Sequence, residues 1–219
     1  MIELNNIIHA DCMDIMRDIP DKYFELAIID PPYGIKEDGR KNHTRCKLTA
    51  SKNYSDKVKY DNCSPDKNYF NELFRISKNQ IVFGANHFIS KIPHDSSCWI
   101  VWDKDNGLTD FADCELAWTS FNTAVRKFKY KWQGMLQENM KNKDILQHPN
   151  QKPVALYRWL LQNYAKTGDK IIDTHSGSGS CAIACHLEKF DFLAIEKDKD
   201  YYEASVKRLD EVRSQGVLF

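Results

Sequence analysis

Asp30, Pro31, Pro32 and Tyr33 form a segment whose residue types suit chemistry on an amino group. The apolar run 26–29 precedes them, so they are expected at the carboxyl end of a buried strand. Proline fixes φ and lacks a backbone N–H, which leaves neighbouring carbonyls free to accept hydrogen bonds. A carboxylate and free carbonyls beside an aromatic ring suit an exocyclic amine on a planar base. A Pro-Pro pair alone would favour an ordinary strand-ending turn.

A second candidate segment, residues 173–180, follows an apolar run and opens a predicted helix. Gly177 and Gly179 permit positive φ and close approach of the backbone to a ligand. Glu196 ends the next apolar run, where its carboxylate is placed to bind a ribose diol. Together with Ala182, these residues also fit the dinucleotide pattern G-x-G-x-x-G/A. For this segment alone, an NAD-dependent enzyme is therefore a real alternative.

A third segment, residues 148–153, precedes a predicted helix. Lys152 is flanked by proline at the start of this helix and could meet a carboxylate. An ordinary capped start of the helix explains the segment equally well without its context.

The elements that must position these segments alternate along the chain. Short apolar, β-rich runs predict strands at 7–8, 26–29, 81–83, 98–102, 116–118, 170–172 and 192–195. Helical spacing and a proline suited to a first turn predict helices at 65–77, 153–165, 180–189 and 200–212. This alternation indicates an α/β fold with a mostly parallel sheet covered by helices on both faces.

Two polar stretches interrupt the alternation. Residues 34–62 are long, basic and without periodicity, and a loop of this length is usually functional or mobile. Residues 119–150 are basic, aromatic and rich in Asn and Gln. Both stretches are expected as insertions above the edge of the sheet where ligand sites of α/β proteins lie.

Charge is balanced over the whole chain and concentrated locally. A formal net charge of +0 excludes a globally basic nucleic-acid binder. Two basic clusters are nevertheless candidates for contacts with phosphates: Lys36, Arg40, Lys41, Arg45, Lys47, Lys52, Lys57 and Lys59, and then Arg126, Lys127, Lys129 and Lys131. For charge runs alone, solvated loops would be the better interpretation.

Composition and cysteine usage favour a globular protein of a reducing compartment. The hydrophobic fraction of 42% argues against disorder. Seven scattered cysteines do not suggest a disulfide framework, and Cys181 and Cys185 are expected to be core residues on one helix face rather than half of a metal site. No apolar run is long enough to span a membrane, and the first residues are unlike a signal peptide. A cytoplasmic location is expected.

The three segments, in this order and over most of the chain, resemble the β class of DNA amino-methyltransferases. In that class a catalytic D-P-P-Y segment precedes the glycine loop that binds S-adenosylmethionine (AdoMet). A target-recognition insertion and a T-Q-K-P-like element lie between them. The resemblance implies one methyltransferase domain over residues 1–219, with a circularly permuted Rossmann-like sheet. The conjunction of segments decides against the NAD-dependent alternative.

The resemblance also implies roles for individual residues. Asp30 and the three residues after it are the expected catalytic segment, and aspartate at this position matches enzymes that act on N6 of adenine. Asp11 is expected to accept from the adenine amino group of AdoMet, although a helix N-cap role is common for such a residue. Lys152 is expected near the AdoMet end of the site. The complete expected AdoMet set is Asp11, Cys12, Lys152, Asp173, His175, Ser176, Gly177, Gly179, Ser180 and Glu196.

Some positions depart from the family pattern. His175 stands where the family often has Phe, and Asn150 stands where it has Thr. The recognition stretch, about 119–147, is short, which favours a small recognition site or a homodimer that shares the work. The partner implied is double-stranded DNA. Methylation of cytosine N4, of RNA or of protein, and a catalytically dead DNA-binding module, stay open as alternatives.

The last residues, Gln215 to Phe219, suggest one further partner. The pattern of Gln215, Leu218 and Phe219 resembles short peptides that dock on the bacterial DNA sliding clamp. A terminal Leu-Phe pair that packs onto its own domain is the alternative, and it is slightly preferred.

Overall fold

The computed structural model describes residues 2–35, 63–107, 112–133, 136–141, 143–148 and 150–215. Within these ranges eight strands form one sheet in the order β1-β10-β9-β2-β3-β5-β4-β6. The first five in this order are parallel: β1 (Asn6–His9), β10 (Asp191–Glu196), β9 (Lys170–Asp173), β2 (Phe24–Ile29) and β3 (Ser77–Phe83). The predicted parallel sheet is confirmed in this half of the molecule.

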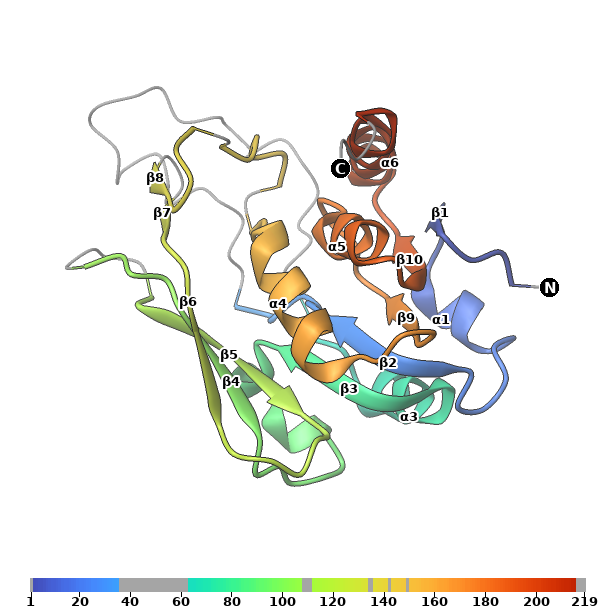
Figure 1. The fold of residues 1–219 in the computed structure, drawn as a ribbon. Coiled ribbons are helices and arrows are strands. Elements are labelled where there is room, and N and C mark those ends of the chain that lie inside the picture. The colour runs from blue at the N-terminus through green and yellow to red at the C-terminus, as the bar shows by residue number, and fades with distance from the viewer. Residues whose placement is uncertain are drawn as a thin grey trace.

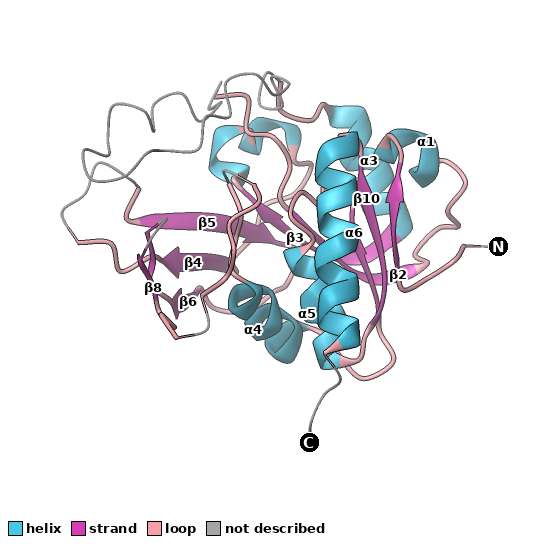
Figure 2. Ribbon diagram, turned by 90° about the horizontal axis from the view of Figure 1, so that it is seen from above, coloured by secondary structure: helices cyan, strands magenta, loops and turns pink. Residues whose placement is uncertain are grey.

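Helices cover both faces of the parallel strands, as predicted (Figures 1 and 2). One face carries α1 (Cys12–Met16) and α3 (Lys67–Ile76), and the other carries α4 (Val154–Tyr164), α5 (Ser180–Glu188) and α6 (Lys199–Ser214). Side chains of a strand alternate between faces. In β2, accordingly, Leu26 and Ile28 join the core under α4 and α5, whereas Ala27 and Ile29 join the core under α3.

Local capping explains where several helices begin. The carboxylates of Asp66 and Asp198 accept hydrogen bonds from backbone amides in the first turns of α3 and α6, which satisfies donors that have no partner inside the helix. Pro153 precedes α4 and supplies a preset φ instead of a side-chain cap. These starts lie within two residues of the predicted ones. Pro65, which was predicted in the first turn of α3, instead precedes the N-cap Asp66.

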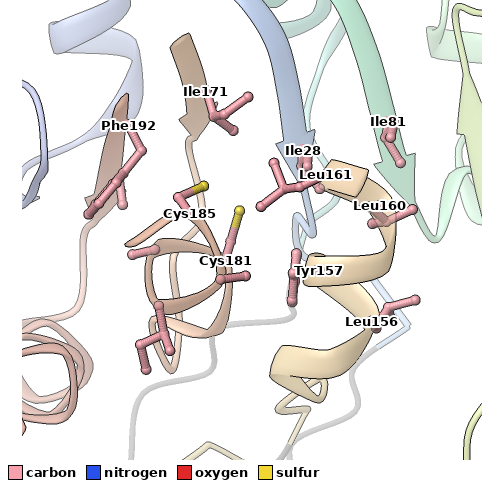
Figure 3. Close-up of a cluster of buried hydrophobic side chains, with 14 of the residues drawn as sticks. Ile28, Ile81, Leu156, Tyr157, Leu160, Leu161, Ile171, Cys181, Cys185 and Phe192 are labelled. Carbon is pink, nitrogen blue, oxygen red and sulfur yellow. The ribbon is translucent and has the colours of Figure 1, made fainter. Parts of the chain in front are cut away.

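The larger core lies between the sheet and the pair α4 and α5. Figure 3 shows Leu161 of α4 beside Ile28 and Leu160 beside Ile81 of the strands. Leu156 belongs to the same cluster, one turn earlier in α4. Cys181 and Cys185 of α5 are buried in the same cluster. Their predicted role as small core residues is confirmed.

An extension adds three more strands beyond β3. β5 (Cys114–Thr119) runs antiparallel to β3, β4 (Trp99–Asp103) runs antiparallel to β5, and β6 (Arg126–Lys129) runs parallel to β4. A separate two-stranded sheet joins β7 (Trp132–Gln133) and β8 (Leu136–Gln137). Sequence periodicity missed β6, β7 and β8, because short strands of mostly charged or polar residues carry no clear alternation of apolar residues.

The strand order creates a switch point between β2 and β9. The chain leaves β2 through α3, on one face, to reach β3, whereas it leaves β9 through α5, on the other face, to reach β10. Crossovers that diverge in this way open a crevice at the carboxyl ends of the two central strands. Among the described residues, no helix has the length and apolar character that crossing a membrane requires.

Candidate active site

The predicted segments meet at the switch point. Asp30 directly follows β2, Asp173 ends β9 and Glu196 ends β10, so their parallel strands bring them to one edge of the sheet. A cavity of about 120 Å³ opens there. Its lining includes Asp30, Pro31, Pro32, Tyr33, Lys152, His175, Ser176, Gly177, Ser180 and Glu196. A wider open groove of about 610 Å³ lies along α6, and no residue of the predicted segments lines it.

The carboxylate of Asp30 is held by two side chains that donate to it. The Lys152 ammonium lies 2.5 Å from Oδ2, and the Tyr33 hydroxyl donates to Oδ1 at 2.7 Å. Lys152 was predicted at the AdoMet end of the site, but its Nζ contacts the segment predicted for catalysis. The predicted segment 148–153 therefore brings its lysine to the carboxylate of the predicted segment 30–33.

Two further charged residues, which sequence analysis missed, complete this contact. Glu115 of β5 lies 3.0 Å from the Lys152 ammonium through Oε2, and its Oε1 lies 2.5 Å from the Lys104 ammonium. The antiparallel course of β5 brings its first residues to the same edge as the ends of the parallel strands. In the sequence, Lys104 follows the apolar run 98–102 and Glu115 precedes the run 116–118. That position is the only sequence signal for them, because their partners depend on strand order.

Burial and charge act against each other in this group. Burial raises the pKa of Asp30, Lys152 opposes this rise, and the charge of Glu115 adds to it. Burial also tends to raise the pKa of Glu115, but the two ammonium groups outweigh it and lower this pKa to about 2. For Lys152, burial tends to lower the pKa, yet the two carboxylates raise it above its usual value. A protonated lysine between two carboxylates is the stable arrangement.

The Tyr33 ring lines the pocket and is tightly packed by its neighbours. It stacks on His87 with a centroid separation of 5.2 Å. Gly84, at φ +67°, lies so close that a Cβ at this position would be 2.1 Å from a ring carbon. The missing side chain of Gly84 therefore allows the tyrosine hydroxyl to reach Asp30.

The glycine segment presents polar groups to the other side of the pocket. The Gly177 amide donates to Oε2 of Glu196 at 2.7 Å, and the Asp198 amide donates to Oε1 at 2.8 Å. The carboxylate is thereby fixed in orientation while each oxygen keeps a lone pair. The buried hydroxyl of Ser176 has no hydrogen-bond partner among the described residues.

Two other residues of this segment have structural roles. The Ser180 hydroxyl accepts from Arg208 at 2.9 Å. Gly179 has φ +75° and lies against Ser205, where a Cβ would come within 3.0 Å of the serine Cβ. Gly179 shapes the turn into α5 without lining the pocket.

Asp173 is buried behind the pocket lining, whereas His175 belongs to the lining, and both are largely uncharged at neutral pH. Burial raises the pKa of Asp173 to about 8, although a hydrogen bond from the His175 amide partly opposes the shift. Burial lowers the pKa of His175 to about 4. Beneath them, the Tyr69 hydroxyl shares a 2.5 Å hydrogen bond with Thr174. A ligand ammonium beside Asp173 would convert the carboxyl to its charged form.

Asp11 and Cys12 lie at the end of the neighbouring strand β1. Asp11 caps α1 by accepting from the Met13 amide at 2.9 Å, as the N-cap alternative anticipated, and its other oxygen lies 2.7 Å from the Lys197 ammonium. Burial raises the pKa of Cys12 to about 12, so its thiol is not ionised. Register pairs His9 with Glu196, which brings Asp11 to the rim beside Glu196 rather than into the pocket lining.

The predicted DNA-contacting residues of the second cluster follow the edge strand β6. Lys127 pairs with Asp103 at 3.4 Å, while Lys129 and Lys131 pair with Asp105 at 2.9 and 3.5 Å. Arg126 lies towards the far end of the strand from the pocket. Lys36, Arg40, Lys41, Arg45 and the rest of the first cluster lie outside the described residues, as do Leu218 and Phe219 of the predicted clamp peptide.

Comparison with known proteins identifies the family. The model of the N6/N4 methyltransferases, described as DNA methylase, matches residues 24–207. The chain belongs to the N6/N4 DNA methylase family. The match spans the segments 30–33, 148–153 and 173–180 and also Glu196, whereas Asp11 and Cys12 precede it.

Curated relatives and solved structures are similar to this chain over most of its length. The type II methyltransferase M2.MboI of Moraxella bovis is 24% identical, over 94% of this chain and 88% of the relative. The solved structure of the M1.HpyAVI–SAM complex is 19% identical with a TM-score of 0.56, over 94% of this chain and 98% of that one. PvuII DNA methyltransferase, which is cytosine-N4-specific, is 11% identical with a TM-score of 0.60, over 96% and 91%. The predicted Rossmann-like methyltransferase fold is confirmed.

Proposed function

We propose that this DNA methylase transfers a methyl group from AdoMet to the N6 amino group of adenine in double-stranded DNA. One observation carries the proposal: the carboxylate of Asp30 and the glycine segment that ends at Ser180 line the same pocket. A group that binds an exocyclic amine and a loop that binds a methyl donor must be adjacent for a direct transfer.

AdoMet is the methyl donor, and the chemistry of the pocket fits it. The oriented carboxylate of Glu196 offers acceptors for ribose hydroxyls. We assign the buried Asp173 carboxyl, which accepts from the amide of the lining residue His175, to the amino group of the donor. The unpartnered hydroxyl of Ser176 offers a further polar contact. AdoMet supplies an electrophilic methyl group on a sulfonium. A related fold, that of M1.HpyAVI, is known as a complex with SAM.

Adenine is favoured over cytosine by the residue at position 30. Aspartate is the residue that the resemblance associates with adenine-N6 enzymes, whereas cytosine-N4 enzymes more often carry serine there. The fold does not discriminate, since the cytosine-N4-specific PvuII enzyme is also similar. The carboxylate can accept hydrogen bonds from an amino group more strongly than a hydroxyl can.

The proposed mechanism depends on how Asp30 meets the amino group. The nitrogen lone pair of adenine is conjugated with the ring, so hydrogen bonds to Asp30 and to the Pro31 carbonyl would favour sp³ character and free the lone pair for attack. A base inside a duplex must be flipped out to reach such a pocket, at a cost of a few kcal/mol. Stacking on Tyr33 would offset about 1–3 kcal/mol. Because the Tyr33 hydroxyl already donates to Asp30, the incoming amino group must share or displace that hydrogen bond.

A methyl-transfer assay with nucleoside analysis tests the proposal. Purified protein, tritiated AdoMet and unmethylated bacterial DNA should yield label in N6-methyladenosine. Label in N4-methylcytosine would overturn the assignment of adenine but keep the pocket and the donor. Bound AdoMet without labelled DNA would instead direct the same assay to RNA and protein substrates.

A further inference from the structure

Four charged side chains form a continuous alternating row at the edge of the pocket. From the reacting end outward they are Asp30, Lys152, Glu115 and Lys104, with separations of 2.5, 3.0 and 2.5 Å. Each comes from a different place: after β2, before α4, within β5 and after β4. The row carries two negative and two positive charges.

Stability alone does not account for this row. The side chain of Lys152 is 3% exposed, and those of Lys104 and Glu115 are 16% and 22% exposed. Removing charges from water costs several kcal/mol per ion, and buried ion pairs often do no better than apolar side chains of the same size. Glu115 and Lys104 are therefore candidates for a role in the reaction.

Glu115 controls how strongly Lys152 acts on Asp30. A lysine paired with Asp30 alone would direct its full positive charge at that carboxylate. Asp30 would then be a weaker hydrogen-bond acceptor for the substrate amino group. With Glu115 3.0 Å away, the ammonium is shared between two carboxylates. Lys104 in turn balances Glu115. Tyr33 and Tyr157 also face Asp30, from the segment after β2 and from α4, and Asp173 faces it from β9.

We propose that Glu115 and Lys104 are positioning residues for methyl transfer, which hold Lys152 between two carboxylates so that Asp30 stays a charged and available acceptor. This inference rests on the proposed function. Glu115 also lies 3.5 Å from the Tyr33 hydroxyl, which donates to Asp30, so it acts on the amino group through Lys152, Tyr33 and Asp30 and not by direct contact.

The two positions have opposite electrostatic effects. Glu115→Gln removes a negative charge that repels Asp30 and a partner of Lys152, so the pKa values of both groups fall. Lys104→Gln removes the charge that balances Glu115, so both pKa values rise. If transfer needs an ionised Asp30 and a protonated Lys152, the pH–rate profile has an acidic and a basic limb. Both limbs should move to lower pH in Glu115→Gln and to higher pH in Lys104→Gln.

Single-turnover rates of methyl transfer, measured from about pH 5 to about pH 10 with saturating DNA and AdoMet, test this. We expect both limbs of the Glu115→Gln profile to move to lower pH by about one unit. Those of the Lys104→Gln profile should move to higher pH. Lys78→Gln is the matched control, because it breaks the Lys78–Glu25 pair at the opposite end of the sheet. Its profile should coincide with that of the wild type.

A positioning role and a merely structural one differ in this experiment. A lower rate with unmoved limbs in both variants would overturn the inference, and so would a wild-type profile that is flat across the range. If Glu115→Gln does not fold, the direction of the Lys104→Gln shift decides. Wild-type protein that transfers no methyl group to DNA would instead refute the proposed function.

Discussion

Lys152 illustrates at the scale of one residue how a partner determines a role. Its ammonium is shared by Asp30 and Glu115 and also lies 5.0 Å from the centroid of the Phe83 ring. Because Glu115 remains when Asp30 is removed, a change at Asp30 does not leave an unpaired buried cation. Variants at Asp30 should therefore fold, which makes this position suitable for a test of chemistry.

Asp30→Ala should abolish most methyl transfer and leave AdoMet binding nearly intact. Loss of the acceptor for the amino group should lower the single-turnover rate about 100-fold or more, whereas the AdoMet dissociation constant should change by less than about threefold, roughly 0.6 kcal/mol. Tritium transfer and calorimetry measure the two quantities. Asp18→Ala, at an exposed aspartate after α1, is the control. Substantial activity in Asp30→Ala would contradict the catalytic role.

Asp173→Asn should stabilise the ligand-free protein and weaken AdoMet binding. Burial raises the pKa of Asp173 to about 8, so the native chain holds a proton that the unfolded chain loses near pH 4. Stability contributed by this group is complete below about pH 4 and is lost as the pH rises to about 8. Asparagine avoids the buried charge, which should add about 1–3 kcal/mol above pH 8.

Urea unfolding at about pH 5 and about pH 9, with and without AdoMet, measures both effects. The AdoMet-dependent stabilisation should shrink in Asp173→Asn because the ligand ammonium loses its carboxylate. Asp18→Asn should change neither quantity, since its side chain is exposed. Full retention of AdoMet affinity in Asp173→Asn would argue against the contact with the ligand ammonium.

At the scale of elements, the turn after β3 controls the position of Tyr33. Gly84 combines φ +67° with contact against the tyrosine ring, and its amide donates to the Leu116 carbonyl of β5 at 3.0 Å. The turn is therefore joined to the antiparallel extension. A side chain at this position would strain the backbone and push the ring away from Asp30.

Gly84→Ala should lower methyl transfer more than its loss of stability explains. The left-handed conformation should cost about 1–2 kcal/mol for alanine, and the ring of Tyr33 must also move. Gly168→Ala is a matched control, because Gly168 has φ +89° with no atom within 4 Å of a Cβ. Gly168→Ala should lose only the stability that the left-handed backbone costs, and Gly84→Ala should lose more in thermal unfolding because the Tyr33 ring must move. Only Gly84→Ala should lose transfer activity at a temperature where both variants are folded. Equal activities would show that the position of Tyr33 is unimportant.

At the scale of the whole molecule, a net charge of +0 gives no overall attraction to DNA. Attraction must come from local clusters of lysine and arginine, and it depends on whether carboxylates already neutralise them. Register places Lys129 opposite Asp103 at the end of β6 that faces the pocket edge. There Asp105 neutralises Lys129 and Lys131. Lysines also protect an edge strand from pairing with other chains, so this cluster has an explanation that does not require DNA.

Asp105→Asn should strengthen DNA binding if these lysines contact phosphates. In the wild type, Lys129 and Lys131 must leave the Asp105 carboxylate before they can contact a phosphate, and in Asp105→Asn they need not. DNA affinity should therefore rise, and the slope of log affinity against log salt concentration should steepen by about one unit. Arg126→Gln should have little effect, because Arg126 lies at the far end of β6. Fluorescence anisotropy over a salt series measures both. An unchanged slope in Asp105→Asn would assign the lysines to protection of the edge.

The sequence by itself determined the alternation of strands and helices and the segments that end at Tyr33 and Ser180. Apolar runs, capping residues and glycines act on near neighbours in the chain, so their effects can be read locally. Only the tertiary structure decided that Lys152 contacts Asp30, that Glu115 and Lys104 extend this contact, and that Lys129 faces Asp105. Those partners meet because strand order and direction bring distant residues to one edge of the sheet, and no local pattern encodes that order.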